Sequence, residues 1–388
     1  MPFYARRGDI PSKRHVVFPK NGGGIHYEHL LGNLGFNGIQ SLIYTLRRPT
    51  TVKSTELAWR QPRQADPDGR LRMRHLRTHR LELGGCPVRD RKLIMFNEDV
   101  VISLTRPSAV EEYFYRNARA DEMLYITRGS GVLESQLGPL EYREGDYLVI
   151  PRGILHRLVP GDGEQIYMVL ESRGHLRTPK RYRNSHGQLL EHSPFCERDI
   201  RVPEAPEPID KMGDFETIVR TDDTCHRVIL DHHPCDTVGW DGYYFPWALN
   251  IADFEPIVGR LHQPPPVHQT FEGDGFVVCS FVPRLYDFHP KAIPAPYNHS
   301  NAMSDEMLYY CRDNFMSRTG IEFGSMTLHP DGLPHGPQPG RTEASIGVKE
   351  TDELAVMVDT FRPLHVAAEA TSCEDEDYGQ SWLGEDPC

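Results

Sequence analysis

The sequence predicts a mainly β protein built from two related barrel or jelly-roll units, with only short helices. One observation behind this is that 33 Gly and 32 Pro residues interrupt the 388-residue chain throughout. Between them lie runs rich in Val, Ile, Leu, Tyr and Phe, at 40–50, 146–153, 165–172 and 276–283. Short apolar runs bounded by turn residues are typical of strands in sandwiches and barrels. Helical apolar periodicity is scarce, so we expect only short helical turns, for instance at 211–219.

An internal repeat is the second observation. Residues 117–125 read NARADEMLY, and residues 301–309 read NAMSDEMLY. Each copy is followed by the pattern Gly-x5-Pro-x-Gly-x2-His, which ends at His156 in the first copy and at His335 in the second. Two motifs recurring in the same order indicate two units that share one fold.

The spacing within each copy predicts a small barrel with a site at its mouth. We expect DEMLY to form a strand that returns through a hairpin to a second strand, which ends at the Pro-x-Gly turn. The turn presents its histidine opposite the acidic side chain of the first strand. This pattern resembles the two motifs of the cupin superfamily, so we expect a bicupin. The expected divisions are an N-terminal segment 1–35, a first cupin-like barrel 36–175, a linker 176–210, a second barrel 211–363 with the metal site, and an acidic, solvated tail 364–388.

Composition narrows the classes of partner. With 43 Lys and Arg against 55 Asp and Glu, the net charge is −12, which disfavours nucleic acid or an anionic membrane as a general partner. No apolar run approaches the roughly 18 residues of a membrane span, and the N-terminus lacks the apolar region of a signal peptide. We therefore expect a cytoplasmic protein. The eight cysteines include no Cys-x-x-Cys pair, which disfavours a zinc ribbon or a disulfide framework.

The two units differ in the residues that could hold a metal. The second offers His299, a carboxylate in 304–307 and His335, and we expect His299 and the carboxylate to share one strand. Two histidines and one carboxylate are the ligand set of oxygen-activating non-heme iron. The first unit has Glu122 and His156 but carries Tyr115 where the second has His299. Because two ligands hold a metal poorly, we expect the first barrel to be metal-free and structural, with Glu122 and His156 paired to each other or to the backbone.

Two neighbouring carboxylates compete for the third ligand position. Side chains alternate along a strand, so Asp305 and Glu306 point to opposite faces unless a bulge intervenes. Glu306 matches Glu122 in the repeat, and its place in the phrase is the one at which cupins carry their ligating Glu. We therefore prefer Glu306 and keep Asp305 as the alternative.

Several segments spread over the chain resemble the homogentisate 1,2-dioxygenase family. They are 25–36, 146–153, 240–250, the stretch 279–306 that leads through His299 to the carboxylate, and 334-PHGP-337 around His335. The resemblance implies Fe(II) held by His299, Glu306 (or Asp305) and His335. It also implies that homogentisate and O2 form 4-maleylacetoacetate, a step of tyrosine and phenylalanine catabolism. By the same resemblance, the protein is expected to be a homo-oligomer.

Two positions depart from that family's pattern. In the phrase Trp-x-Gly-x-x-x-Pro, Asp241 stands where the family carries a histidine that acts as acid or base. A carboxylate does not replace a neutral imidazole donor at neutral pH unless its pKa is raised, so His268, His329 and His289 are candidates to compensate. A tyrosine that the family uses against its substrate corresponds to Asn314. A related hydroquinone-type acid such as gentisate is therefore the alternative substrate.

Two other classes of function compete with a dioxygenase. Cupin spacing alone also allows a metal-dependent isomerase or decarboxylase, which a metal assay with O2 consumption would distinguish. A non-catalytic bicupin that binds a small molecule is the second rival. Such a protein has no reason to keep the complete ligand set in one barrel only.

Overall fold

The computed structural model describes residues 3–263 and 265–383, and its regular structure is almost entirely β, as the sequence predicts. The described residues contain one α-helix, α1 (Arg341–Ser345). The other helical turns are short 3-10 segments: η1 (Thr78–Arg80), η2 (Lys180–Tyr182), η3 (Glu197–Asp199), η4 (Ile251–Asp253), η5 (Pro265–His268), η6 (Ala368–Cys373) and η7 (Tyr378–Trp382). None of them is long and apolar enough to cross a membrane.

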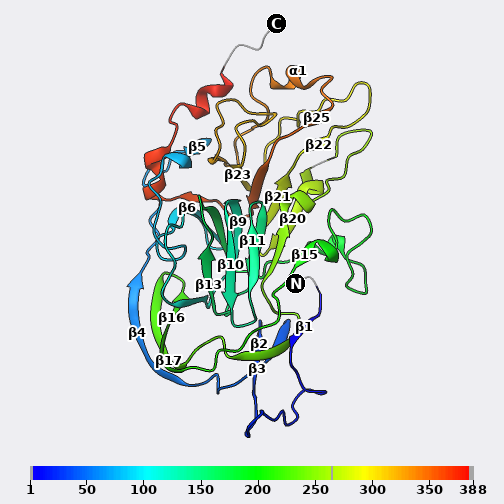
Figure 1. Ribbon diagram of the computed structural model, residues 1–388. Coiled ribbons are helices and arrows are strands. Elements are labelled where there is room, and N and C mark those ends of the chain that lie inside the picture. Colours follow the sequence, from blue (N-terminus) through cyan, green and yellow to red (C-terminus); the bar gives the residue numbers. More distant parts are fainter. Residues whose placement is uncertain (1–2, 264, 384–388) are drawn as a thin grey trace.

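Two sheets supply the strands at the lower end of the molecule in Figure 1, and the larger of them extends to its middle. The smaller has the strand order β1 (Ala5–Gly8), β18 (Thr237–Gly242), β3 (Gln40–Thr45), β2 (Tyr27–Gly32). The larger has the order β11 (Leu140–Arg143), β10 (Ser130–Ser135), β13 (His156–Pro160), β8 (Phe114–Asn117), β16 (Met212–Thr221), β17 (Thr224–His232), β4 (Val52–Arg60).

The remaining sheets contain the two copies of the DEMLY strand. The first copy, β9, lies in the sheet β15 (Ile200–Arg201), β19 (Trp247–Asn250), β12 (Asp146–Ile150), β9 (Asp121–Arg128), β14 (Ile166–Ser172), β7 (Val100–Thr105), β6 (Lys92–Phe96), β27 (His365–Val366). The second copy, β23, lies in the sheet β20 (Gln269–Gly273), β21 (Phe276–Phe281), β26 (Ala355–Thr360), β23 (Asp305–Tyr310), β24 (Ser325–His329), β5 (Arg74–Arg77). Strands β22 (Arg284–Leu285) and β25 (Glu350–Thr351) form a separate pair.

Both copies of the repeat form the strand pair that the cupin-type prediction requires. β9 pairs with β12 in the first copy, and β23 pairs with β24 in the second, both antiparallel. The Pro-x-Gly turn follows each pair, and its glycines, Gly153 and Gly332, both have φ of +79°. Because residues with a Cβ rarely adopt this conformation, glycine at this position allows the chain to turn back sharply.

The sheets cross the division predicted at residue 211. Strands β16 to β19 come after that residue, yet β16 pairs with β8, β18 pairs with β3 and β19 pairs with β12. One hydrophobic core also joins both halves, since Tyr125 and Tyr147 from the first half pack in it with Phe271 and Tyr309 from the second. The two predicted units therefore share sheets and a hydrophobic core. The predicted boundaries between them stay a prediction.

Two expectations from the sequence are wrong in detail. Residues 212–221 form strand β16 and not a helical turn, because their β-branched residues fit between the two strands that pair with it, β8 and β17. The described part of the predicted tail, residues 364–383, is not loose and solvated, and residues 384–388 lie outside the described residues. It contributes β27 to a sheet and buries Ala370, Cys373 and Tyr378, so aromatic and small side chains dock it despite its acidic composition.

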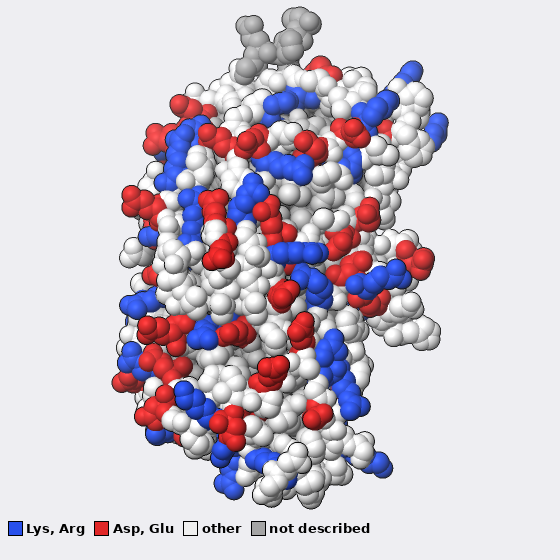
Figure 2. All heavy atoms as spheres, in the orientation of Figure 1, with Lys and Arg blue, Asp and Glu red and all other residues white. Residues whose placement is uncertain are grey.

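The charged side chains are mixed over the surface of the molecule that Figure 2 shows. Acidic and basic groups alternate on this face from the β16 and β17 end to the end that carries α1. The excess of acidic residues is therefore spread over this face and does not gather in one place. An extended basic stripe is the usual mark of a nucleic-acid surface, and the described residues on this face form none.

Candidate metal centre

His299 and His335 are brought together by the backbone that surrounds them. Each donates its N–H to the carbonyl of the other, with N–O distances of 2.8 and 2.9 Å. His299 precedes β23, and His335 follows the turn after β24. The expectation that His299 shares a strand with the carboxylate is therefore wrong, because the strand begins only at Asp305.

The side chains of His299, Glu306 and His335 converge on one point. One ligand atom from each lies within 4.8 Å of the other two. In both histidines the Nδ1 faces a backbone carbonyl, that of Tyr297 at 3.1 Å and that of Leu333 at 3.2 Å. This contact favours the tautomer with the proton on Nδ1, which leaves Nε2 as a bare acceptor, the form in which histidine binds a metal.

The space among these atoms fits a cation better than a hydrogen bond. Each Nε2 lies 3.8 Å from Oε2 of Glu306, which is too far for a hydrogen bond. The Nε2 of His335 is also buried without a hydrogen-bond partner. A buried lone pair without a partner is costly, so two bare nitrogens beside a carboxylate form a donor set suited to a divalent metal.

The neighbouring carboxylate, Asp305, faces away from this point. It accepts the backbone N–H groups of Asp331 at 2.8 Å and Leu364 at 2.7 Å, so it closes the turn after β24 and anchors the start of the C-terminal segment. The alternation of side chains along β23 then directs Glu306 to the histidines. This geometry favours Glu306 over Asp305 as the ligand.

His329 orients the Glu306 carboxylate by contacting Oε1, the oxygen other than the one that faces His299 and His335. Its Nδ1 lies 2.9 Å from Oε1 of Glu306, and its Nε2 lies 3.2 Å from the hydroxyl of Tyr378. Burial lowers the pKa of His329 to about 4, so its ring is neutral at neutral pH. Burial raises the pKa of Glu306, but the hydrogen bond that it accepts from Nδ1–H of His329 stabilises the ionised carboxylate, and that pKa lies well below its usual value. The carboxylate is therefore ionised and held in position.

The C-terminal segment supports this centre, a role that the sequence did not suggest. Besides Tyr378, it contributes Trp382, whose indole N–H donates to the carbonyl of Gly336 at 3.2 Å, directly after His335. Ser381 accepts a 2.6 Å hydrogen bond from Gln338 in the same turn. The only signal in the sequence was the presence of two aromatic residues, Tyr378 and Trp382, in a segment that also contains 374-EDED-377.

A cavity of about 90 Å³ opens beside His299 and Glu306. Phe281 and Phe315 supply aromatic walls, and polar groups come from His262, His268, Arg284, Arg318 and Glu353. Of these, the sequence analysis singled out only His268. Burial lowers the pKa of His268 to about 3, and its Nδ1 is buried without a hydrogen-bond partner. A neutral imidazole with a free ring nitrogen is thus available at the cavity wall.

Other residues suggested by the sequence lie away from this cavity. Asp241 lies in β18, where its carboxylate accepts hydrogen bonds from Tyr4 at 2.9 Å and Arg14 at 3.2 Å. His289 does not line the cavity either. Asn314 donates to Asp352 at 2.8 Å and lines a second, outer cavity.

The equivalent place in the first unit is filled by an arginine. Arg91 donates to Glu122 at 3.0 Å, and the hydroxyl of Tyr115 donates to the same carboxylate at 2.7 Å. The Nδ1 of His156 faces the carbonyl of Ile154 at 3.0 Å, which matches the arrangement at His335. The backbone pairing expected for His156 is therefore present. Glu122 pairs instead with Arg91, whose guanidinium supplies a positive charge where the second unit has its ligand set.

The chain resembles one family model and several curated proteins. Residues 100–251 match the model of the homogentisate 1,2-dioxygenase N-terminal region. A protein of Saccharolobus solfataricus that carries the name "putative dioxygenase" is 40% identical over 98% of this chain and 99% of its own length. The homogentisate 1,2-dioxygenase of Bradyrhizobium diazoefficiens is 29% identical over 73% of this chain, which spans 65% of that protein's length.

Solved structures resemble the chain more distantly. Protein Ylba from E. coli aligns over 79% of this chain and 96% of its own, with 10% identity and a TM-score of 0.38. A mutant oxalate decarboxylase of Bacillus subtilis aligns over 74% of this chain and 76% of its own, with 12% identity and a TM-score of 0.33.

Proposed function

We propose that this chain, which belongs to the homogentisate 1,2-dioxygenase family, is a metal-dependent ring-cleaving dioxygenase acting on a dihydroxylated aromatic acid. The observation that carries the proposal is the pair of bare histidine Nε2 atoms that face the Glu306 carboxylate beside an aromatic-walled cavity. A dioxygenase needs both a metal site and an adjoining space for an aromatic ring, and this arrangement supplies the two together.

Fe(II) is the metal that this donor set suits best for oxygen chemistry. His299, Glu306 and His335 form a set of two histidines and one carboxylate, which leaves other coordination positions open. When bound, the iron supplies the redox chemistry that allows O2 to react with a closed-shell aromatic ring. The proposed substrate is homogentisate, with 4-maleylacetoacetate as the product in tyrosine and phenylalanine breakdown, and gentisate is the alternative.

The protein's own residues would position the ring and handle its protons. Phe281 and Phe315 give the cavity apolar walls that suit a planar ring. The free Nδ1 of His268 is available to accept a hydrogen bond from a ring hydroxyl, since burial keeps this imidazole neutral. His262 lines the same cavity and is a second candidate for this role. His329 would act through Glu306, by fixing the orientation of the carboxylate.

The experiment is anaerobic reconstitution with Fe(II), followed by oxygen-electrode and spectral measurements with homogentisate, gentisate and hydroquinone in parallel. The proposal expects the protein to bind iron stoichiometrically and to take up oxygen with formation of a new ring-opened chromophore. His335→Ala should abolish both the iron binding and the oxygen uptake. Iron binding without oxygen uptake on any of these substrates would refute the proposed reaction but not the metal site. Failure to bind iron would refute both.

A further inference from the structure

Arg318 lacks an anionic partner in the cavity beside His299 and Glu306, which we call the metal cavity. Arg318 lines the cavity and is only 5% exposed. Its Nη1 donates to the carbonyl of Gly336 at 2.8 Å and to Ser317, but its Nε is buried without a hydrogen-bond partner. The part of the chain that the structure describes places no carboxylate within ion-pairing distance of Arg318. By contrast, Arg284 in the same cavity pairs with Glu353 at 2.8 Å.

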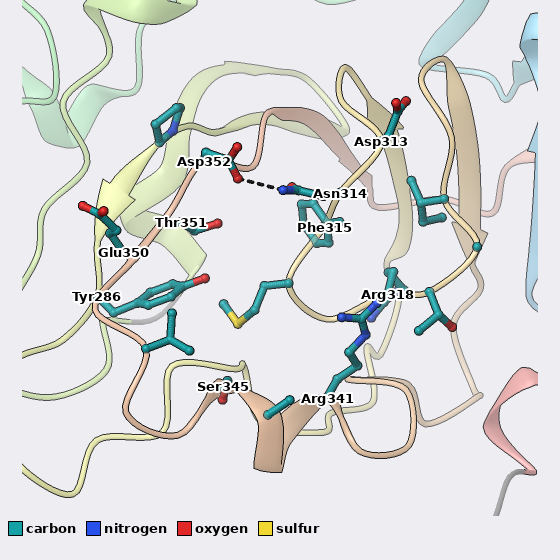
Figure 3. Close-up of a pocket in the computed structure, with 17 residues that line it drawn as sticks. Tyr286, Asp313, Asn314, Phe315, Arg318, Arg341, Ser345, Glu350, Thr351 and Asp352 are labelled. Carbon is teal, nitrogen blue, oxygen red and sulfur yellow. Dashed lines mark hydrogen bonds between the residues drawn. The ribbon is translucent and has the colours of Figure 1, made fainter.

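A second unpaired arginine lies nearby in an outer cavity of about 680 Å³ (Figure 3). This outer cavity shares Phe315, Met316 and Arg318 with the metal cavity, so these three residues stand at the junction. Arg341 also lines it, and the Nε of Arg341 is buried without a partner. Figure 3 shows Arg318 and Arg341 on the same side of the outer cavity, across from Asp352.

Of the acidic residues that line this cavity, Asp352 and Asp313 have other partners, and within the described residues Glu350 forms no ion pair with either arginine. Asp352 accepts a hydrogen bond from Asn314 and pairs with Arg312, and Asp313 accepts the backbone N–H of Phe323. Arg318 at the junction and Arg341 in the outer cavity are therefore left without a paired carboxylate. Burying an unpaired charge is unfavourable, and a carboxylate is the anion whose two oxygens match the planar fork of a guanidinium.

We propose that Arg318, assisted by Arg341, binds the carboxylate of the substrate whose aromatic ring lies at the metal centre. The position of the ring is taken from the proposed function, on which this inference rests. A carboxylate-binding Arg318 selects an aryl acid over a neutral hydroquinone as the substrate. The ring occupies the inner cavity against the edge-to-face pair of Phe281 and Phe315, and the acidic side chain extends towards the junction where Arg318 stands. Arg318 also holds the carbonyl of Gly336, so the anchor for the acid is tied to the turn that carries His335.

The test is anaerobic calorimetry on the full-length Fe(II)-loaded protein, with homogentisate and its methyl ester as probes. The ester keeps the ring and removes the charge. A charge-assisted hydrogen bond of this kind is worth about a tenfold preference or more, so wild type should bind the acid at least tenfold more tightly than the ester. Arg318→Gln should remove this preference without weakening the ester, and Arg341→Gln should reduce it a few-fold.

Two further variants keep the test decisive. Arg312→Gln removes a charge from the same loop at a position that lines neither cavity, so it should leave both affinities unchanged. Arg318→Lys keeps the charge but loses the fork, so it should retain part of the preference if Arg318→Gln does not fold. Equal affinity of wild type for acid and ester, or an unchanged preference in both Arg318 variants, would overturn the proposal.

Admitting O2 afterwards separates the two proposals. If the acid is preferred but no ring-opened product forms, the carboxylate site stands and the proposed reaction fails. If acid and ester are opened with the same KM, the reaction stands and the carboxylate site is overturned.

Discussion

Replacing Arg91 by methionine tests our proposal that only the second of the two units holds a metal. The substitution removes a buried cation that donates to Glu122 at 3.0 Å, while the hydrogen bond from Tyr115 to the same carboxylate remains. Removing one partner of a buried ion pair costs about 3 to 5 kcal/mol, because the other charge stays buried without compensation. With an unfolding entropy of about 2.1 cal/mol/K per residue over 388 residues, this corresponds to a fall in Tm of about 4 to 6 °C.

The loss of stability in Arg91→Met should also depend on pH. Burial raises the pKa of Glu122, but Arg91 outweighs it and lowers that pKa to about 2. A carboxyl with a depressed folded-state pKa stabilises the fold above its unfolded pKa, and this contribution is lost as the pH falls towards 2. In Arg91→Met the buried carboxyl takes up a proton more readily. The difference in Tm between wild type and variant should therefore be full at pH 7 and should narrow as the pH falls below about 4.5.

The assay is thermal unfolding of Arg91→Met beside a control, Arg227→Met, which breaks an exposed pair with Glu56 and should shift Tm by less than about 1 °C. Adding Tyr115→His to Arg91→Met completes the ligand set of the first unit. The double variant should bind two metal ions per chain where wild type binds one. An Arg91→Met protein as stable as wild type, or a double variant with unchanged metal stoichiometry, would refute this account of the first barrel.

Three further predictions concern the second unit. Glu306→Gln should lose the metal. Asp305→Asn should keep it and lose about 1 to 3 kcal/mol of stability, because it places an amide group against the N–H donors of Asp331 or Leu364. Metal analysis and melting curves distinguish the two variants, and metal loss only in Asp305→Asn would show that the ligand is misassigned. Tyr378→Phe should weaken metal binding by about tenfold with the fold intact, since it removes the partner of His329, and an unchanged affinity in a chelator competition would exclude this positioning role. Asp241→Asn should leave metal content and kcat unchanged, because Asp241 bonds Tyr4 and Arg14 away from the cavity; a large fall in kcat in steady-state assays would contradict this.

The features of the site that the sequence could predict are those encoded in the repeat. Aligning the two copies singled out Glu306 and His335, and it exposed the difference between Tyr115 and His299. The structure brings the three proposed ligands of the second unit within 4.8 Å of one another. The mainly β fold was also predictable, because short β-branched and aromatic runs between turn residues are a local signal.

The features that the sequence could not predict depend on distant parts of the chain. Arg91 directly precedes β6 and Tyr378 lies in η7, both outside the repeat, so no spacing rule points to them. Asp241 was singled out by its place in a motif, and a motif does not report the distance of its residue from the metal centre. The sharing of β16 to β19 with the first half depends on tertiary pairing, which local sequence does not encode.

The most direct test of the central claim is mass spectrometry of the product formed from homogentisate by Fe(II)-loaded protein under isotopically labelled O2. A ring-cleaving dioxygenase centred on His299, Glu306 and His335 predicts a ring-opened product with both labelled oxygen atoms, and no such product from Glu306→Gln. A product with one labelled atom or none, or undiminished product from Glu306→Gln, would contradict the account.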